Sequence, residues 1–376
     1  MTGVLRPRFP IDFDETPFLV IWEVTRACAL ACVHCRAEAV ACRDPRELTT
    51  EDGFRLIDQV SQFGEPRPLF VLTGGDPMRR PDLAALVRHA AEAGLTVALT
   101  PSGTAAATRA RLAHLKEAGL SRIAVSLDGP DAESHDAFRR VKGSYAWTRR
   151  IIDATIDLAL PLQINSTISR LTLPYLERMA ALMGELPVTL WAVFFLVQTG
   201  RGAALDQVSP EEAERVLEFL YDLSLTAPFG IKTTEAPHYH RVIWQKDRAR
   251  KDAGLVPVAG ERRRQLRAPR SVGDGNGFVF IDHVGNICPS GFLPVPRGNV
   301  KDGRLAEVYR QDDVFKRLRN PNELHGKCGR CEFRAICGGS RSRAFAATGA
   351  LMASDGLCAY DPGPIVRPVI DVGRPF

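Results

Sequence analysis

One stretch decides the fold, and it reads Phe18-Leu-Val-Ile-Trp-Glu-Val-Thr-Arg-Ala-Cys-Ala-Leu-Ala-Cys-Val-His-Cys-Arg36. Its first part, up to Val24, is almost wholly apolar and predicts a buried β-strand. The strand leads into a loop in which Cys28, Cys32 and Cys35 have the spacing C-x3-C-x2-C. The strand therefore positions a site made of three thiols.

Three thiols in so short a loop predict an iron–sulfur site. Thiolates are the soft ligands that iron–sulfur clusters require, and three of them leave one iron of a four-iron cluster without a protein ligand. Two alternatives stay open from the triplet alone. One is a structural zinc site completed by His34 or Cys42, and the other is a set of unrelated buried thiols.

A strand-then-helix pattern then repeats along the chain. Six such units in succession predict an α/β protein whose parallel sheet curls into a partial (β/α)6 TIM-like barrel, with function on the loops that follow the strands. After the first strand, apolar runs predict strands at 69–72, 96–100, 122–127, 162–167 and 188–197. Helical periodicity predicts helices at 49–63, 81–93, 105–118, 145–159, 173–184 and 209–224.

The chain divides into four parts by composition. We expect an extended lead-in over 1–17, the barrel over 18–228, a linker or substrate-facing segment over 229–270, and a small irregular domain over 271–376. The third part contains the basic run Arg262–Arg270, which we interpret as a solvated linker. The fourth begins with two short strands around a turn at Val284-Gly285, and such a small domain usually needs a metal to hold it.

Composition excludes several classes of function. The formal net charge of +5 is mild and no groove-reading motif accompanies it, so nucleic acid is not an expected partner. No apolar run is long enough for a membrane span or a signal peptide, and we expect a cytoplasmic protein. Its nine cysteines are then metal ligands or core thiols rather than disulfides. We expect Cys42 to be a core thiol.

The cysteine triad and the turn Gly74-Gly75-Asp76-Pro77 after the second strand resemble those of radical S-adenosylmethionine (SAM) enzymes, over residues 18–225. In that family the triad holds a [4Fe–4S] cluster whose open iron is chelated by SAM. One electron, from a flavodoxin- or ferredoxin-like donor, cleaves SAM to methionine and a 5′-deoxyadenosyl radical that abstracts a substrate hydrogen. The resemblance implies a radical SAM enzyme.

The resemblance also implies which residues surround SAM. The glycines match the family motif, whereas Asp76 stands where Glu is usual. Arg139 resembles an arginine that pairs with the SAM carboxylate, and His34 stands where an aromatic residue often lies near the adenine. The complete set of expected SAM-binding residues is Gly74, Gly75, Asp76, Ser126, Arg139, His34, Ser102 and Asn165. Of these, Ser102 and Asn165 are also explained as caps of a helix or turn.

The remaining cysteines resemble the SPASM extension of radical SAM enzymes, which houses auxiliary clusters. The pattern is Cys328-x2-Cys331-x5-Cys337 followed by Cys358, with Arg341 where a further cysteine would be expected. This implies one auxiliary [4Fe–4S] cluster on those four thiolates. Cys288 is then a spare thiol near that cluster or an alternative ligand. A zinc ribbon is the competing interpretation of this region.

One segment concerns the substrate. The run Lys232-Thr-Thr-Glu-Ala-Pro-His-Tyr-His240 resembles a segment of SPASM enzymes related to haem biosynthesis. His238 and His240 are the candidates for a catalytic role there, and a structural role is the alternative. The first functional hypothesis is therefore a tetrapyrrole substrate whose propionate side chains are removed or oxidised. The others are a maturase acting on a ribosomally made peptide and a non-catalytic iron–sulfur electron-transfer protein.

Overall fold

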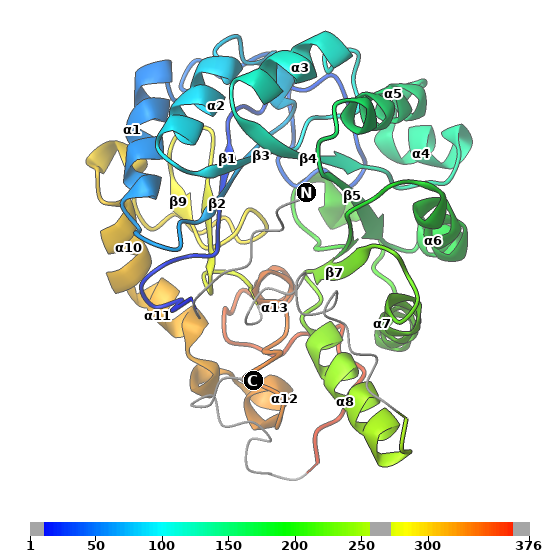
Figure 1. Ribbon diagram of the computed structural model, residues 1–376. Helices are drawn as coiled ribbons and strands as arrows, with labels where there is room; N and C mark the ends of the chain where they lie inside the picture. The colour runs from blue at the N-terminus through cyan, green and yellow to red at the C-terminus, as the bar shows by residue number, and fades with distance from the viewer. Residues whose placement is uncertain (1–10, 256–271, 364–376) are drawn as a thin grey trace.

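A computed structural model describes residues 11–255 and 272–363. Within those residues the strands form one sheet in the order β7-β6-β5-β4-β3-β2-β1-β8-β9 (Figure 1). Neighbouring strands are parallel except for β8 and β9, which form an antiparallel pair. The bounds are β1 Leu19–Glu23, β2 Leu69–Thr73, β3 Thr96–Leu99, β4 Leu120–Ser126, β5 Leu162–Ile168, β6 Leu190–Phe195, β7 Gly230–Thr234, β8 Phe278–Ile281 and β9 Ile287–Cys288.

Helices cover the outer face of this curled sheet, as Figure 1 shows. Each predicted strand-then-helix unit is present, so the predicted partial barrel is confirmed. The helix α4 was not predicted, because it is short and mostly polar; it begins after Asp131, whose side chain accepts a hydrogen bond from the Ser134 amide. The helices are α1 Thr50–Ser61, α2 Leu83–Glu92, α3 Arg109–Glu117, α4 Ala132–Arg139, α5 Ser144–Asp157, α6 Leu176–Glu185 and α7 Pro210–Ser224.

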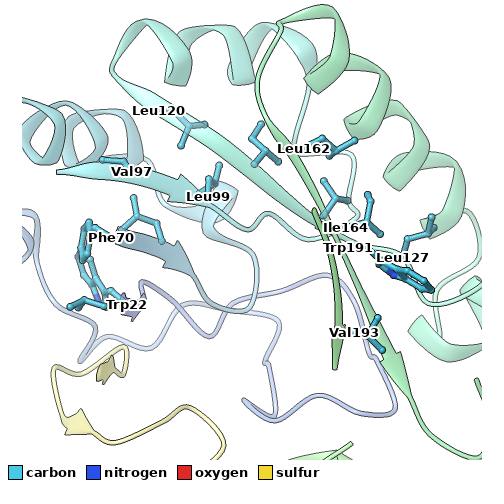
Figure 2. Close-up of a cluster of buried hydrophobic side chains, with 14 of the residues drawn as sticks. Trp22, Phe70, Val97, Leu99, Leu120, Leu127, Leu162, Ile164, Trp191 and Val193 are labelled. Atoms are coloured by element: carbon cyan, nitrogen blue, oxygen red, sulfur yellow. The ribbon is translucent and has the colours of Figure 1, made fainter. Parts of the chain in front are cut away.

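The main hydrophobic core lies between the strands and these helices. Alternate strand residues point into it, among them Trp22, Phe70, Ile164 and Trp191, each of which is fully buried (Figure 2). The residues between them face the opposite side, which we call the barrel lumen. Its walls include Ile21 and Val71, Arg122, Ala124 and Ser126, Gln163, Asn165 and Thr167, Ala192 and Phe194, and Lys232.

Residues 229–270 were expected to be a linker or a substrate-facing segment, and the linker alternative is wrong for residues 230–252. Residues Gly230–Thr234 form β7, which extends the sheet beside β6, and His238–Asp252 form the helix α8. The strand was missed because only Ile231 gives it an apolar face, and the helix because its sequence is largely charged. The basic run Arg262–Arg270 lies outside the described residues.

The C-terminal part is joined to the barrel and is more regular than predicted. The turn at Val284-Gly285 connects β8 to β9 as expected, but β8 also pairs with β1 and so continues the barrel sheet. Four short helices follow, namely α10 Leu305–Gln311, α11 Asp313–Arg319, α12 Gly326–Arg330 and α13 Arg341–Thr348. Within residues 11–255 and 272–363, no helix is both long and apolar enough to span a membrane.

Candidate cofactor site

The cysteine loop leaves the carboxyl end of β1 and is held by backbone hydrogen bonds. The amide of Cys28 donates to the Val40 carbonyl at 2.8 Å, which closes the loop on itself. The sulfur of Cys28 accepts from the Leu30 amide at 3.3 Å. Cys28 and Cys32 are buried and Cys35 is half-buried. These hydrogen bonds fix the course of the loop that carries the three cysteines.

Arg201, which the sequence did not single out, braces the same loop from the far side of the sheet. It lies in the short 3-10 turn η3, Gly200–Ala204, after β6. Its Nε donates to the Cys32 carbonyl at 3.0 Å, its Nη1 to the Ala39 carbonyl at 3.1 Å, and its amide to the Cys35 carbonyl at 3.0 Å. No sequence pattern marks this role, because it depends on where the end of β6 lies relative to the loop.

The turn after β2 packs directly against the cysteine loop. The amide of Gly75 donates to the Thr25 carbonyl at 2.7 Å, and a Cβ atom on Gly74 would lie 2.3 Å from that same carbonyl oxygen. A Cβ on Gly75 would lie 2.6 Å from the carbonyls of Arg26 and Ala27. Both positions therefore require glycine, because any side chain would push the cysteine loop away.

Asp76 serves the turn internally. Its carboxylate is fully buried and accepts hydrogen bonds from the Met78 amide at 3.1 Å and from the Thr104 hydroxyl at 2.7 Å. Burial raises the pKa of this carboxyl above its ordinary value. Ser102 lies beside it and connects the turn to the loop, since its hydroxyl donates to the Gly75 carbonyl at 2.5 Å and lies 3.5 Å from the Cys28 sulfur.

A buried ion pair lies on the opposite side of the loop. Arg139, at the end of α4, pairs with Asp128, and its Nη1 lies 3.5 Å from the Cys32 sulfur. Asp128 also accepts from the Thr167 amide at 2.7 Å. Burial opposes ionisation of Asp128, but the adjacent guanidinium outweighs it and holds the carboxyl pKa below its ordinary value. Asp128 is a site residue that the sequence did not identify, although it directly follows Ser126-Leu127.

His34 presents a neutral aromatic ring at the site. The ring stacks on Phe138 of α4, with 4.4 Å between centroids and 15° between planes. Burial, followed by the charge of Arg139, lowers the pKa of His34 to about 3. Its Nδ1 is buried without a hydrogen-bond partner among the described residues. The uncharged ring thus extends the apolar surface beside the cysteines.

Ser126 and Asn165 lie side by side on β4 and β5, in the lumen below the loops. The side-chain oxygen of Asn165 accepts from the Gln163 amide group at 2.7 Å. The structure thus surrounds the cysteine loop with the predicted Gly74, Gly75, Ser102, His34 and Arg139, and places Ser126 and Asn165 on the adjacent strand ends.

These residues fit a cluster with a bound cofactor. Three thiols share one loop, and the tight glycine contacts hold the β2 turn against it. In the described part of the chain, no three His, Cys, Asp or Glu side chains converge on the position of a single metal ion. A [4Fe–4S] cluster does not need three side chains on one metal ion, because each thiolate binds a different iron.

The second group of cysteines gathers at the C-terminal end. Cys328 is buried, and Cys331, Cys337 and Cys358 are half-buried. The sulfur of Cys328 accepts from the Asp355 amide at 3.5 Å, and Nη2 of Arg341 lies 3.9 Å from it. Arg341, which replaces an expected cysteine, therefore brings a positive charge to this group of thiols.

Two of the predictions about cysteines change with the structure. Cys42 is exposed, so the prediction of a core thiol is wrong; its neighbours Arg43 and Asp44 are polar and the segment lies on the surface. Cys288 is buried in β9, and burial raises its pKa to about 12. The charged groups that act on it are Asp282, Arg36 and Glu23, which groups Cys288 with the barrel rather than with the four C-terminal cysteines.

The two candidate histidines lie at the start of α8. His238 is buried, and its Nε2 lies 3.3 Å from the carboxylate of Asp355, which in turn pairs with Arg343 at 3.0 Å. Burial disfavours its charge, but Asp355 and Cys358 outweigh this and raise the pKa of His238 to about 9. His238 thus links α8 to the C-terminal cysteine region. His240 is half-buried on the same helix.

Comparison with known proteins identifies the class. A profile of the radical SAM superfamily matches residues 22–183. The chain is 41% identical over 358 residues to a protein of Oleidesulfovibrio alaskensis named AdoMet-dependent heme synthase, covering 95% of this chain and 90% of that protein. It is 37% identical to one of the same name from Methanosarcina barkeri, covering 94% and 99%. The chain therefore belongs to the radical SAM superfamily, whose members use SAM and a [4Fe–4S] cluster.

Other relatives have names that refer to peptide substrates. The chain is 28% identical to a PqqA peptide cyclase of Rhodopseudomonas palustris, covering 92% of this chain and 88% of that protein. The structure of SuiB from Streptococcus suis bound to S-adenosylmethionine superposes with a TM-score of 0.68, covering 92% of this chain and 78% of that chain at 16% identity. At that identity the likeness concerns the fold alone.

Proposed function

We propose that this radical SAM enzyme acts on the propionate side chains of an iron tetrapyrrole, as an AdoMet-dependent haem synthase. The observation that carries the proposal is the similarity to proteins of that name over nearly the whole of both chains, at 41% and 37% identity. The similarity to the peptide cyclase is equally long but much lower, at 28%.

Aromatic side chains near the cysteine loop favour a flat apolar substrate. The rings of Phe194 and Phe292 lie 6.5 Å apart, and the guanidinium of Arg36 lies 4.4 Å above the ring of Phe280. Arg36 directly follows Cys35, so this aromatic wall adjoins the cluster loop. Arg36 itself pairs with Glu23 at 3.0 Å, so it is the aromatic rings, not this cation, that favour a flat macrocycle.

The residues around the loop have distinct roles in this proposal. Cys28, Cys32 and Cys35 hold the cluster, and the backbone of Gly74 and Gly75 meets the methionine part of SAM. Arg139, oriented by Asp128, offers a guanidinium to the SAM carboxylate, and the neutral ring of His34 lies by the adenine. Ser126, Ser102 and Asn165 supply further polar contacts. When bound and reduced by one electron, the cofactor pair supplies a carbon radical that removes hydrogen from an unactivated C–H bond.

On the substrate side, the reaction balances as an oxidative decarboxylation. A propionate loses one hydrogen atom from its β-carbon to the SAM-derived carbon radical, then CO2 and one electron, which an oxidised iron–sulfur cluster of the protein would take up, and a vinyl group remains. We assign Cys328, Cys331, Cys337 and Cys358 to an auxiliary [4Fe–4S] cluster. His238 and then Arg241 outweigh burial and lower the pKa of Cys358, whereas burial raises the pKa of Cys331 to about 11 and that of Cys337 well above its ordinary value. Neither His238 nor His240 has a catalytic role in this assignment.

The proposal includes an electron donor and a compartment. A flavodoxin- or ferredoxin-like protein would supply the single electron. The enzyme would work in the reducing cytoplasm, because all nine cysteines are unpaired thiols and thiolate ligands must stay reduced.

The test is anaerobic reconstitution of the protein with iron and sulfide, followed by reduction in the presence of SAM and iron coproporphyrin III, a porphyrin with four propionates. We expect 5′-deoxyadenosine and a porphyrin that has lost CO2 and two hydrogens at one or two propionates, both detected by mass spectrometry. The Cys32→Ala variant is the matched control and should give neither product. If the wild type forms 5′-deoxyadenosine while the porphyrin stays intact, the tetrapyrrole assignment is wrong and a peptide substrate takes its place. If a fully clustered protein forms no 5′-deoxyadenosine, the clusters serve electron transfer only.

A further inference from the structure

We propose that Arg122 and Lys232 form an anion-binding pair inside the barrel lumen that holds one carboxylate of the substrate. This inference rests on the proposed function, and it adds the residues that select the substrate. Arg122 belongs to no motif of the sequence analysis. Lys232 begins the segment 232–240 that the sequence relates to the substrate, but it was given no role there.

Strand alternation directs both side chains into the lumen. On β4, the neighbours Ile123 and Val125 belong to the hydrophobic core under the helices, so Arg122 points to the other face. On β7, Ile231 packs against that core, so Lys232 also points to the lumen. The register places Lys232 opposite Ala192, in line with Asn165 and Ser126 across four neighbouring strands.

Neither cation has a partner among the described residues. No hydrogen bond or ion pair there involves Arg122 or Lys232, and the Nε of Arg122 is buried without an acceptor. Four arginines that are more deeply buried pair with carboxylates, in Arg80–Asp82, Arg139–Asp128, Arg241–Glu214 and Arg343–Asp355, whereas Arg122 and Lys232 are half-buried. Because a charge withdrawn from water without a partner is costly, two half-buried cations in one lumen point to an anion that completes the site.

The two charges also act on each other. Burial, and then the charge of Arg122, lowers the pKa of Lys232 to about 8. Burial alone lowers the pKa of Arg122. A bound carboxylate would relieve both effects at once, since it pairs with the ammonium and the guanidinium together. Gln163 lies on β5, one of the two strands between them, and its side-chain amide faces the same lumen.

The position of Arg122 points to the substrate rather than to SAM, whereas Lys232 is level with Ser126 and Asn165. Arg122 lies on the same face of β4 as Ser126 but nearer the start of the strand, away from the loop that carries the cysteines. The surrounding wall includes apolar Ile21 and Val71 as well as Phe194. An apolar wall with two cations fits an apolar molecule that projects a carboxylate arm, which is the chemistry of a porphyrin propionate.

The experiment measures the affinity of anaerobically reconstituted holoenzyme for iron coproporphyrin III, by titration of the porphyrin absorption band. Arg122→Gln and Lys232→Gln remove one charge each, and we expect either to weaken binding about tenfold or more. The charge-retaining Lys232→Arg should stay within about threefold of the wild type. Arg109→Gln is the control, because Arg109 is an exposed cation whose partner Asp157 is also exposed. The iron content of each variant shows whether it is folded. If Arg122→Gln loses iron, the test rests on the porphyrin affinities of Lys232→Gln and Lys232→Arg compared with the wild type.

The outcomes separate this inference from the proposed function. If the wild type binds the porphyrin and the two charge-removing variants bind it equally well, the anion site is wrong while the proposed function stands. If the wild type binds no porphyrin, the proposed function fails and the inference fails with it. Weaker binding in both Gln variants with recovery in Lys232→Arg is the result we expect.

Discussion

At the scale of single residues, the site depends on backbone contacts that tolerate no side chain. Gly74 and Gly75 were expected at the site from their motif, and the structure adds the reason, which is the approach of the β2 turn to the Thr25 carbonyl. Asp128 and Arg201 were not predicted. Their roles depend on which distant side chain or carbonyl each one meets, and a single sequence does not record such tertiary contacts.

The glycine contact gives a sharp mutational prediction. Gly74→Ala would place a Cβ 2.3 Å from the Thr25 carbonyl oxygen, so the turn and the cysteine loop must separate. We expect a loss of about 2–3 kcal/mol in stability and an iron content well below that of the wild type after reconstitution.

The matched control is Gly184→Ala in α6, where a Cβ meets nothing within 4 Å. That change should leave the iron content unaltered and stabilise the helix by up to about 1 kcal/mol. Equal iron contents in the two variants would contradict the role given to Gly74.

Lys232 makes stability depend on pH in a predictable direction. Its pKa is about 8 in the folded protein against an ordinary value of 10.5, so between these values the unfolded chain binds more protons and stability rises with pH. Below pH 8 the buried charge is destabilising. We therefore expect Lys232→Met to raise stability by roughly 1 kcal/mol at pH 7, an advantage that disappears by about pH 10.5.

The measurement is anaerobic thermal unfolding of Lys232→Met and of the wild type in parallel at each pH. The difference in stability between the two proteins isolates Lys232 from other groups that titrate in the same range. Lys116→Met serves as the comparison, because Lys116 is exposed on α3 and its ammonium donates to the Leu158 carbonyl. An advantage for Lys232→Met that is the same at pH 7 and pH 10.5 would show that the buried charge is not the cause.

At the scale of elements, predictability followed the apolar content of each segment. The strands β1 to β6 were found because their core-facing positions are filled with residues such as Trp22, Phe70 and Trp191. The helices α4 and α8 and the strand β7 were missed because their sequences are short or polar. Their structure depends on the neighbouring strands and helices that cover one side of each, which overrides weak local preference.

The turn η3 is the element that braces the cysteine loop, and its contribution can be measured. Arg201→Gln removes the bonds from the guanidinium to the carbonyls of Cys32 and Ala39. We expect local opening of the loop to become easier by roughly 2 kcal/mol, or about 30-fold. The readout is the rate at which a chelator bleaches the cluster absorption in holoenzyme.

The control for this change is Arg170→Gln. Arg170 lies after β5 and pairs with Glu212 at 3.3 Å on the surface, so its removal should not alter the bleaching rate. Bleaching of Arg201→Gln at the wild-type rate would mean that the loop is held without η3.

At the scale of the whole molecule, the barrel and the C-terminal part act as one structure. The sheet continues from β1 into β8, and Arg343 of α13 donates to the carbonyl of Glu235 at the end of β7 at 2.7 Å. The sequence predicted the barrel and both groups of cysteines, because strand periodicity and ligand spacing are local. It did not predict how the C-terminal part attaches, because that depends on pairs such as His238–Asp355 that join distant segments.

The number of clusters follows from the two groups of cysteines. We expect reconstituted wild type to contain about eight iron atoms per chain and Cys328→Ser about four, because four thiolates close each auxiliary [4Fe–4S] cluster. Cys288→Ser is the control and should keep about eight, since Cys288 lies among barrel residues. A wild type with about four iron atoms that Cys328→Ser does not reduce would remove the auxiliary cluster.

The exposure of Cys42 has a practical consequence. It is the one exposed thiol among the nine cysteines of this protein, and it lies on the segment that follows the cluster loop. A maleimide spin label applied after reconstitution would react there first, since burial or metal protects the others. Paramagnetic broadening of that label would then report reduction of the nearby cluster as electrons arrive, without any need to follow product.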